Sequence, residues 1–375
     1  MKYYIISGEA SGDLHGSNLV KELKLLDTKA QFRVWGGDLM KEEGATLVKH
    51  YRELAFMGFA EVIKNIGTIL KNIKFCIEDI QQYQPDVVIL IDYPGFNLRI
   101  AKKLKAINNT KIFYYISPQV WAWKKSRVHT IKKVIDKMFV ILPFEKEFYA
   151  QYGYEVEFVG HPLLDAMKNL PPVSREEFLR QQNIASEKPV IALLPGSRKQ
   201  EIAKMLPLML SVVEKFPGYR FIVAGAPSVP ASFYQEFIVD KEMNVVFGNT
   251  YNLLRISNAA LVTSGTATLE TALLKVPEVV CYKGSWASFQ IAKRLVDVKF
   301  ISLVNLIMDK QVVKELIQEE LNTENLVNEL ARLLNDSEYR DMVIHDFELL
   351  QKKLGDAGAS RNTAIGMLKT LESLS

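Results

Sequence analysis

Residues 190–202, VIALLPGSRKQEI, give the clearest indication of the fold class. The apolar run Val190–Leu194 is typical of a strand buried on both faces, and the Pro195-Gly196 pair is typical of a tight turn. A helical pattern follows from Arg198 onward. A buried strand, a glycine turn and a helix form the repeating unit of a parallel α/β sheet. The amino terminus of such a helix, together with the Arg198 guanidinium, favours an anion such as a diphosphate.

Short apolar runs alternate with helical patterns on both sides of this stretch. We expect buried strands at Tyr3–Ser7, Phe32–Gly36, Val87–Ile91, Ile112–Ile116, Met138–Leu142 and Glu157–Val159, and again at Val190–Leu194, Arg220–Ala224, Asn244–Phe247, Ala260–Thr263 and Val279–Tyr282. Amphipathic stretches such as Ser17–Leu26 and Leu98–Ile107 lie between them. The pattern predicts an α/β fold with two Rossmann-like, doubly wound domains facing across a cleft, where we expect the active site.

A Pro-Pro break in residues 169–174 (NLPPVS) predicts the linker between the domains. We therefore expect an N-terminal domain at residues 1–170 and a C-terminal domain at residues 171–375. From Lys310 onward the sequence is polar and helical and predicts no further strand. A final helix at about residues 361–374 is expected to pack back on the N-terminal domain.

The 375 residues suffice for two domains of ordinary size. Hydrophobic residues make up 48% and charged residues 24%, which excludes a disordered chain. The net charge of +4 is too small to indicate a nucleic-acid-binding protein. The charge is uneven, however, because eleven Lys and Arg but one acidic residue, Asp136, lie between Arg99 and Lys137. We expect this segment to make one face of the N-terminal domain positive, which suits phosphates or anionic lipid.

The two cysteines, Cys76 and Cys281, lie far apart, which excludes a disulfide framework and favours a reducing cytoplasm. The apolar run near the start is too short for a signal peptide, and no run reaches the roughly 18–20 apolar residues of a membrane span. Residues 54–75 are strongly apolar, with Ile66, Ile69, Leu70 and Ile73 on one helical face. Two interpretations stay open for them: a buried core helix, or a surface that contacts lipid.

The first loop, SGEASGD at residues 7–13, lies between a strand and a helix. Its glycines allow close approach of the backbone to a ligand, and a helix amino terminus favours an anion. It matches neither GxGxxG nor the P-loop pattern. Substrate contact through this loop is one interpretation, and a tight turn capped by Ser11 or Asp13 is the other.

Asp92 directly follows the predicted strand Val87–Ile91 and is held by a Pro-Gly turn. A carboxylate there can accept a proton from a substrate hydroxyl as general base, or it can cap the next helix. SPQVWAWKKSR at residues 117–127 places Trp121 and Trp123 beside cations, which suits stacking on a sugar, a membrane interface, nucleic acid or simple packing. For His161, a structural hydrogen bond and catalysis both stay open.

The stretch TSGTATLE at residues 263–270 repeats the strand, small-residue turn and helix of residues 190–202. Glu270 lies early in that helix, where a carboxylate can accept hydrogen bonds from ribose hydroxyls. Two such loops in one domain indicate a nucleotide-type ligand, with ordinary helix capping as the alternative. No Asp-x-Asp pair and no HExxH motif occur, so neither a metal site nor any other cofactor is expected.

Together these motifs resemble the bacterial lipid-A-disaccharide synthases over nearly the whole chain. The motifs that carry the resemblance are SGEASGD at 7–13, LAFMGFAEV at 54–62, IDYPGFN at 91–97, YISPQVWAWKKSR at 115–127, LPFEKEFY at 142–149, VGHPL at 159–163, LLPGSRKQEI at 193–202, SGTATLE at 264–270 and FISLVNLI at 300–307. The resemblance implies the GT-B glycosyltransferase fold. It also implies transfer from UDP-2,3-diacylglucosamine to 2,3-diacylglucosamine 1-phosphate (lipid X), giving the β-1,6-linked lipid A disaccharide 1-phosphate and UDP.

The resemblance further implies roles for matched positions. Asp92 and Arg198 correspond to the catalytic aspartate and arginine, and Asn305 to a functional asparagine. The predicted substrate-binding residues are Gly8, Glu9, Ser11, Gly12, Asn97, Ser117, Trp121, His161, Gly196, Ser197, Ser264, Gly265, Thr266, Glu270 and Asn305. The N-terminal domain is expected to bind the acceptor and lipid, and the C-terminal domain the UDP-sugar.

The implied location is the cytoplasmic face of the inner membrane, with the protein bound peripherally to anionic lipid and without a nucleic-acid partner. The oligomeric state stays open, with a homodimer as one alternative. Other functions also stay open: another UDP-sugar GT-B enzyme, such as the peptidoglycan-precursor glycosyltransferase or a UDP-GlcNAc 2-epimerase, or a non-catalytic nucleotide-sugar or lipid-binding protein.

Overall fold

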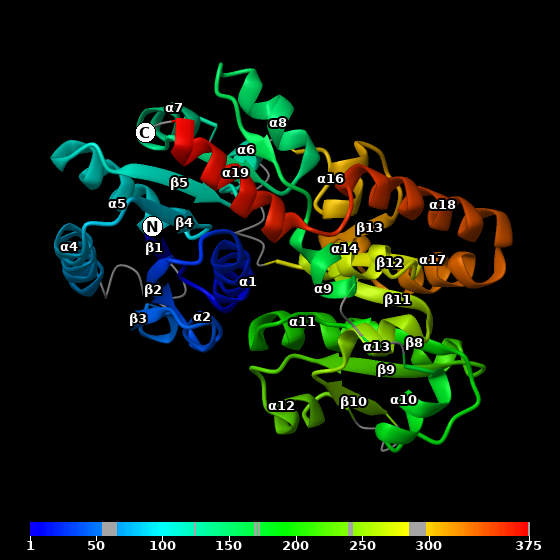
Figure 1. The fold of residues 1–375 in the computed structure, drawn as a ribbon. Coiled ribbons are helices and arrows are strands. Elements are labelled where there is room, and N and C mark those ends of the chain that lie inside the picture. The colour runs from blue at the N-terminus through cyan, green and yellow to red at the C-terminus, as the bar shows by residue number, and fades with distance from the viewer. Residues whose placement is uncertain are drawn as a thin grey trace. The chain divides into compact units, whose positions relative to one another are not determined.

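The computed structural model describes residues 1–54, 66–123, 125–168, 171, 173–238, 243–284 and 298–373. The chain divides into two compact units, unit 1 (Met1–Asn169 and Leu354–Ser375) and unit 2 (Leu170–Lys353). Each unit has its own parallel sheet flanked by helices (Figure 1). Two doubly wound α/β units confirm the predicted fold class. Residues 55–65 of the apolar segment, and 169, 170 and 172 of the predicted linker, lie outside the described residues.

The sheet of unit 1 has seven parallel strands in the order β3-β2-β1-β4-β5-β6-β7. Their bounds are β1 Lys2–Ile6, β2 Gln31–Gly36, β3 Thr46–His50, β4 Val87–Ile91, β5 Lys111–Tyr115, β6 Lys137–Val140 and β7 Glu157–Phe158. From β1 the chain proceeds outward through β2 and β3, and then returns to the other side of β1 with β4. The strand order therefore reverses between β1 and β4, and ligands of such sheets bind beyond the carboxyl ends of the strands at this point.

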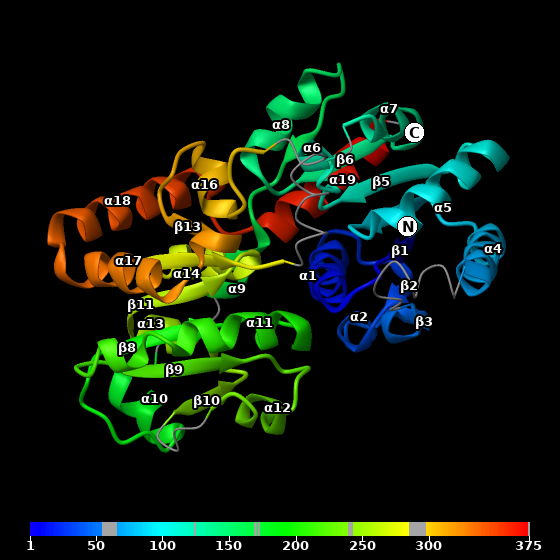
Figure 2. The ribbon, with the colours of Figure 1, turned by 180° about the vertical axis from the view of Figure 1, so that it is seen from behind.

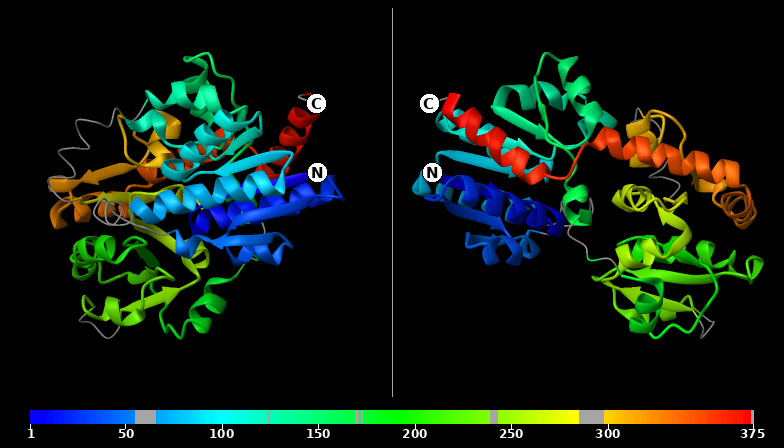
Figure 3. Two further views of the ribbon diagram at one scale, coloured as in Figure 1. Left: turned by 90° about the vertical axis from the view of Figure 1, so that its left-hand side faces the viewer. Right: turned by 45° about the vertical axis from the view of Figure 1, so that its right-hand side comes forward.

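Helices cover both faces of this sheet because its central strands are apolar throughout and buried. One face packs against α1, α2 and α19, and the other against α4, α5 and α7. The helices of unit 1 are α1 Ala10–Leu26, α2 Asp38–Glu42, α4 Ile66–Tyr83, α5 Pro94–Ile107, α6 Val120–Trp123, α7 Arg127–Val134, α8 Pro143–Ala150, α9 Pro162–Lys168 and α19 Ala359–Ser373. The C-terminal helix α19 packs along α1 (Figures 1 and 3). At the start of α19, the Gly358 and Ser360 N–H groups donate hydrogen bonds to the Asp165 carboxylate of α9.

The sheet of unit 2 has six parallel strands in the order β10-β9-β8-β11-β12-β13, so its order reverses between β8 and β11. The bounds are β8 Val190–Leu194, β9 Arg220–Gly225, β10 Asn244–Phe247, β11 Ser257–Thr263, β12 Glu278–Tyr282 and β13 Lys314–Ile317. The helices are α10 Arg175–Gln181, α11 Lys199–Leu210, α12 Ala231–Gln235, α13 Thr250–Arg255, α14 Thr266–Leu273, α16 Leu303–Met308, α17 Thr323–Asn335 and α18 Ser337–Leu354. Side chains of α10 and α13 pack on one face of the sheet, and α17 packs against β11, β12 and β13 (Figure 2).

The expectation of no strand after Lys310 is wrong, because β13 pairs with β12. Its sequence KELI is short and half polar, and it lacks the continuous apolar run of a strand that is recognisable without its neighbours. The edge strand β3 is missed for the same reason, since most of its residues are only half-buried. Helix α1 also begins at Ala10, seven residues before the predicted amphipathic stretch, so the loop after β1 is only three residues long.

The described part of the apolar segment 54–75 combines core and surface positions. Ile73 of α4 is buried, and Ile69 packs against the same core. Leu70 and Phe75 of the same helix are 52% and 45% exposed. Ile69 and Ile73 therefore lie on the core-facing side of α4, whereas Leu70 and Phe75 lie on the surface. Within the described residues, none of the helices has the length and apolar character that crossing a membrane requires.

Candidate active site

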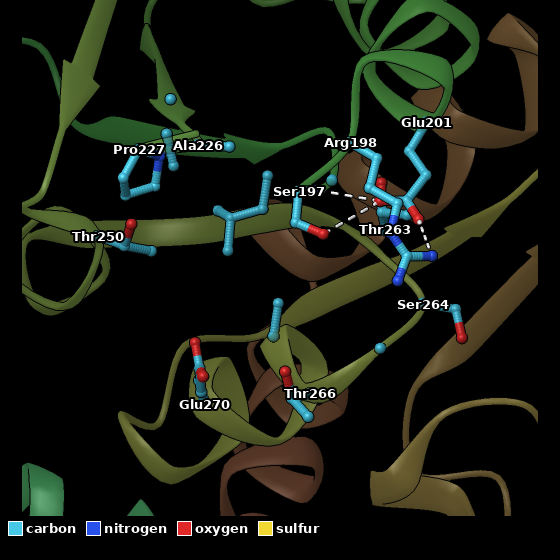
Figure 4. A pocket seen from close by; sticks show the side chains of 16 residues that line it. Ser197, Arg198, Glu201, Ala226, Pro227, Thr250, Thr263, Ser264, Thr266 and Glu270 are labelled. Carbon is cyan, nitrogen blue, oxygen red and sulfur yellow. Dashed lines mark hydrogen bonds and ion pairs between the residues drawn. The ribbon is translucent and has the colours of Figure 1, made fainter. Parts of the chain in front are cut away.

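A pocket of about 350 Å³ lies at the carboxyl edge of the sheet of unit 2, where the strand order reverses. Its walls are the segments that follow β8, β9 and β11, together with the start of α13 (Figure 4). The lining residues are Leu194, Gly196, Ser197, Arg198, Glu201, Ala224, Gly225, Ala226, Pro227, Thr250, Thr263, Ser264, Gly265, Thr266, Ala267 and Glu270. The volume lies in the range of small-molecule sites. The structure thus brings seven predicted residues together: Gly196, Ser197, Arg198, Ser264, Gly265, Thr266 and Glu270.

The loop after β8 forms one wall of this pocket. Gly196 has φ +119°, a conformation that favours glycine, and α11 begins three residues later. The Ser197 N–H donates to the Glu201 carboxylate at 3.0 Å, and the Arg198 guanidinium lies 3.7 Å from the same carboxylate. Arg198 is largely exposed. Backbone N–H groups, a helix amino terminus and an arginine fork therefore meet at one place, as an anion site requires.

The loop after β11 forms the opposite wall. The Ser264 hydroxyl donates to the Ile301 carbonyl at 3.1 Å, which ties this loop to the segment before α16. Helix α14 begins at Thr266, and Glu270 lies one turn further along it. Figure 4 shows the side chains of Thr266 and Glu270 on the same side of the pocket. Burial raises the pKa of Glu270, and a hydrogen bond with Tyr251 opposes this shift. Its oxygens can accept hydrogen bonds from ligand hydroxyls.

In unit 1, Asp92 lies at the corresponding edge of the sheet, directly after β4. Asp92 and Tyr93 have φ values of 43° and 48°, so two consecutive non-glycine residues adopt the left-handed conformation. Such strain costs about 1–3 kcal/mol per residue and persists where the surroundings enforce it. Here the side-chain amide of Asn97 donates to the Asp92 carbonyl at 2.7 Å, and the Tyr114 hydroxyl donates to the same carbonyl. The backbone of Asp92 is therefore held from two sides.

The Asp92 carboxyl is partly buried, and burial together with the nearby negative charge of Glu9 raises its pKa to about 6. Glu9 lies in the loop after β1, the strand next to β4. A carboxylate with a pKa near 6 is ionised at neutral pH and is a stronger base than a solvent-exposed one. At neutral pH the Asp92 carboxylate can therefore accept a proton more readily than an ordinary exposed carboxylate.

Four further predicted residues of unit 1 lie in the loop after β1, the strand next to β4, and in the first turn of α1. Glu9 and Ser11 are exposed. A Cβ atom on Gly8 would lie 2.3 Å from the Tyr93 ring, and one on Gly12 would lie 2.8 Å from the Ser7 Cβ. Both glycines are therefore needed for close packing of this loop. Neither Ser11 nor Asp13 caps α1; the Asp13 carboxylate instead accepts N–H groups at the start of α2.

Four other predicted side chains of unit 1 are buried. Asn97 donates its amide to backbone carbonyls, and Ser117 hydrogen-bonds with the Tyr149 hydroxyl at 2.7 Å. Trp121 packs edge-to-face on Phe144. The His161 imidazole accepts the Leu163 N–H, and burial, together with the charge of His15, lowers its pKa to about 3. These contacts are made within the protein and hold the loops at the sheet edge, and the roles of the four residues in substrate binding stay predictions.

Asn305, in unit 2, is likewise held by contacts within the protein. Its side chain is 0% exposed. Its amide donates to the Val313 carbonyl and the Glu315 carboxylate, each at 2.9 Å, and its carbonyl oxygen accepts the Val312 and Val313 N–H groups. Glu315 in turn accepts the Ile301 and Ser302 N–H groups. Through Glu315, Asn305 therefore helps to hold the segment whose Ile301 carbonyl accepts a hydrogen bond from Ser264. Its role in substrate binding stays a prediction.

Several pocket residues were not singled out from the sequence. Ala226 and Pro227 follow β9 in a glycine–proline turn, AGAP, which is a loop signal of the same kind as PGS after β8. Glu201 lies inside the quoted motif LLPGSRKQEI, but nothing local indicates that its carboxylate folds back on the loop. Thr250 begins α13 and carries no recognisable pattern. Among the described side chains, no group of three or more His, Cys, Asp or Glu is placed to hold a metal ion.

Comparison with known proteins identifies the family. The model of the lipid-A-disaccharide synthetase family matches residues 3–364. The lipid-A-disaccharide synthase of Syntrophus aciditrophicus is 39% identical over 375 residues, covering 98% of this chain and 97% of the relative. Those of Geobacter sulfurreducens and Coxiella burnetii are 37% and 36% identical, covering 98% and 96% of this chain and 96% of each relative.

Solved structures show the fold. The chain is similar to a UDP-GlcNAc 2-epimerase from Neisseria meningitidis bound to UDP-GlcNAc, with a TM-score of 0.69, 14% identity and coverage of 98% and 100%. It is also similar to a Methanocaldococcus jannaschii UDP-GlcNAc 2-epimerase in complex with UDP-GlcNAc and UDP, with a TM-score of 0.66, 15% identity and coverage of 99% and 100%. These likenesses show the GT-B type of fold alone. By its sequence and its family match, the chain belongs to the lipid-A-disaccharide synthases, a family of glycosyltransferases.

Proposed function

We propose that this chain transfers the diacylglucosamine unit of UDP-2,3-diacylglucosamine to 2,3-diacylglucosamine 1-phosphate, forming the β-1,6-linked disaccharide 1-phosphate and UDP. The observation that carries the proposal is the match, over 98% of the chain, to relatives named lipid-A-disaccharide synthase. The pocket of unit 2 and the strained aspartate of unit 1 give this reaction two sets of chemically suited groups.

UDP binds in the pocket of unit 2 in this proposal. The Ser197 N–H, the amino termini of α11 and α14, and the Arg198 guanidinium receive the diphosphate, whose negative charge they complement. Glu270 accepts hydrogen bonds from the ribose hydroxyls. The UDP-GlcNAc 2-epimerases solved with UDP-GlcNAc or UDP bound support a nucleotide-sugar ligand for a fold of this type.

Asp92 acts as the general base on the acceptor. Its carboxylate takes the proton of the acceptor 6-hydroxyl while the hydroxyl oxygen bonds to the anomeric carbon of the donor. The bond from that carbon to the diphosphate oxygen breaks at the same time, and UDP leaves with the electron pair. Attack from the face opposite UDP inverts the anomeric centre. Arg198 and the loop N–H groups stabilise the charge that develops on the leaving diphosphate.

The raised pKa of Asp92 predicts the acid side of the pH profile. The base must be ionised, so kcat/KM is expected to fall about tenfold per pH unit below about pH 6, where Asp92 becomes protonated. Glu9→Gln removes a negative charge that raises this pKa, and should move the acid limb to lower pH. Profiles of kcat/KM for the wild type and Glu9→Gln measure this, with the exposed Glu42→Gln as control. An acid limb that stays in place in Glu9→Gln would contradict the assignment.

We also propose that unit 1 binds the acceptor and an anionic membrane surface, at the cytoplasmic face of the inner membrane. The basic residues between Arg99 and Lys137 suit the acceptor phosphate and anionic headgroups. Leu70 and Phe75, exposed on α4 beside Lys71 and Lys74, suit insertion at the interface. The buried free thiols of Cys76 and Cys281 are compatible with a reducing compartment.

Sedimentation with lipid vesicles tests membrane binding. More of the protein should bind vesicles that contain phosphatidylglycerol than vesicles of phosphatidylcholine alone, because the basic residues attract anionic headgroups. Replacing Leu70 and Phe75 together by serine should lower the bound fraction several-fold by removing apolar contact area. The control is serine at Leu25, which is 63% exposed on α1. Equal binding to both kinds of vesicle would contradict the proposal.

Release of UDP tests the reaction class. UDP should form only when both lipids are supplied, because the acceptor hydroxyl is the nucleophile. UDP release from UDP-diacylglucosamine alone, at the same rate as with the acceptor, would instead indicate hydrolysis or an epimerase-like elimination. Binding of UDP without turnover would indicate a non-catalytic nucleotide-sugar-binding protein.

A further inference from the structure

The Glu201 carboxylate lies directly on the anion-binding groups of the pocket. Glu201 belongs to the first turn of α11, and its side chain folds back toward the loop after β8 (Figure 4). One carboxylate oxygen accepts the Ser197 N–H at 3.0 Å and the Ser197 hydroxyl at 3.4 Å. The other lies 3.7 Å from the Arg198 guanidinium. A side-chain anion thus contacts the donors that suit the oxygens of a diphosphate.

Gly196 leaves the space that this contact needs. A Cβ atom on Gly196 would lie 2.7 Å from the Glu201 Cβ and 2.8 Å from the same carboxylate oxygen that accepts the Ser197 N–H. With φ +119°, the residue also has a conformation that other side chains rarely adopt. Both features require glycine at position 196, and the absence of a Cβ atom there leaves room for the folded-back Glu201 side chain.

We propose that Glu201 is an affinity-determining residue of the nucleotide pocket, whose carboxylate competes with the diphosphate for the Ser197 N–H and the Arg198 guanidinium. This inference rests on the proposed function, since it needs UDP in this pocket. One N–H group cannot donate a strong hydrogen bond to two anions at once, and two anions a few ångströms apart repel each other. Diphosphate binding therefore displaces the carboxylate, which lowers the affinity for UDP and favours its release as product.

A second role for Glu201 makes the opposite prediction. If its carboxylate only organised the loop, it would keep the Ser197 N–H and Arg198 in place for the ligand, and its loss would weaken UDP binding. Glu201→Gln separates the two roles. The glutamine carbonyl can still accept the Ser197 N–H, but the negative charge that repels the diphosphate is gone.

Titration calorimetry with UDP and with uridine, on the full chain, tests the inference. Glu201→Gln is expected to bind UDP about fivefold more tightly than the wild type, the effect of one unit charge at about 4 Å in a solvated site. Uridine carries no phosphate, so its affinity should stay within about twofold. Glu214→Gln, at an exposed position outside the pocket lining, changes the net charge equally and should leave both affinities unchanged.

Glu201→Ala, which removes the competing acceptor altogether, should also tighten UDP binding about fivefold, and it serves as an independent variant should the glutamine form not fold. Unchanged or weaker binding of UDP by the Glu201 variants overturns the inference. So does an equal gain in uridine affinity, because the effect would then not depend on the phosphates. If the wild type binds UDP but the variants do not differ, only the inference fails. If the wild type does not bind UDP, the proposed nucleotide site fails as well.

Discussion

Asp92→Asn is expected to slow disaccharide formation by about 10²–10⁴-fold, the usual contribution of a positioned general base. The amide has almost the same shape as the carboxylate but does not take up the proton of the acceptor hydroxyl. Asparagine also tolerates the left-handed conformation of position 92, so the turn and its hydrogen bonds from Asn97 and Tyr114 should persist. Steady-state UDP release with both lipids measures the effect. The KM for the UDP-sugar should change little, because the pocket of unit 2 is intact.

Asp86→Asn is the matched control for this substitution. Asp86 lies at the opposite, amino end of the same strand, where it is exposed and accepts the Lys2 N–H. Its replacement should leave the rate near the wild-type value. Thermal unfolding of both variants shows whether the fold is kept. A correctly folded Asp92→Asn protein with near-normal turnover would contradict the assignment of Asp92 as the base.

Arg198→Ala is expected to lower kcat/KM by about 10²–10³-fold, because it removes a charged donor from the site where the leaving diphosphate gains charge. Arg198→Lys should recover only part of this loss, since an ammonium group keeps the charge but lacks the planar fork that binds two oxygens at once. The affinity for UDP should decrease from the wild type to Arg198→Lys and further to Arg198→Ala. Kinetics with both lipids and calorimetry with UDP measure the two effects.

Lys204→Ala controls for the general loss of a positive charge. Lys204 lies on the same helix, exposed and outside the pocket lining. It should change kcat/KM by less than about twofold, because an exposed charge at that distance is screened. If Arg198→Ala retained wild-type kcat/KM and UDP affinity, the diphosphate would have to bind elsewhere in the chain.

The sequence was most informative where a structure depends on neighbouring residues. Val190–Leu194 and Val87–Ile91 are apolar throughout because both faces of these strands are buried, so their place in a parallel sheet was predictable. The loops after them contain glycine and proline, which mark the strand ends. Because strand ends of a parallel sheet share one edge, the clustering of Ser197 with Ser264 and Thr266 in one pocket followed from the same reasoning.

The sequence was least informative where a residue depends on partners far along the chain. Strand β13 contains Glu315, a charged residue that is nevertheless buried. Its carboxylate accepts hydrogen bonds from the Ile301 and Ser302 N–H groups and from the Asn305 side-chain amide. The role of Asn97 likewise depends on the unusual conformation of Asp92, which no local pattern predicts. The motifs single out Asn97 and Asn305, but only the structure shows that the side chains of both hold backbone groups in place.

Mass spectrometry of the reaction products shows whether the chain joins the two lipids into a disaccharide. The purified chain is incubated with UDP-2,3-diacylglucosamine and 2,3-diacylglucosamine 1-phosphate, and Asp92→Asn serves as the negative control. The wild type should form a product with the mass of the acceptor plus one diacylglucosamine unit, together with an equal amount of UDP. The Asp92→Asn variant should form both products at least about a hundredfold more slowly. A wild-type reaction that returns only unchanged lipids, or that yields free diacylglucosamine and UDP, would contradict the proposed function.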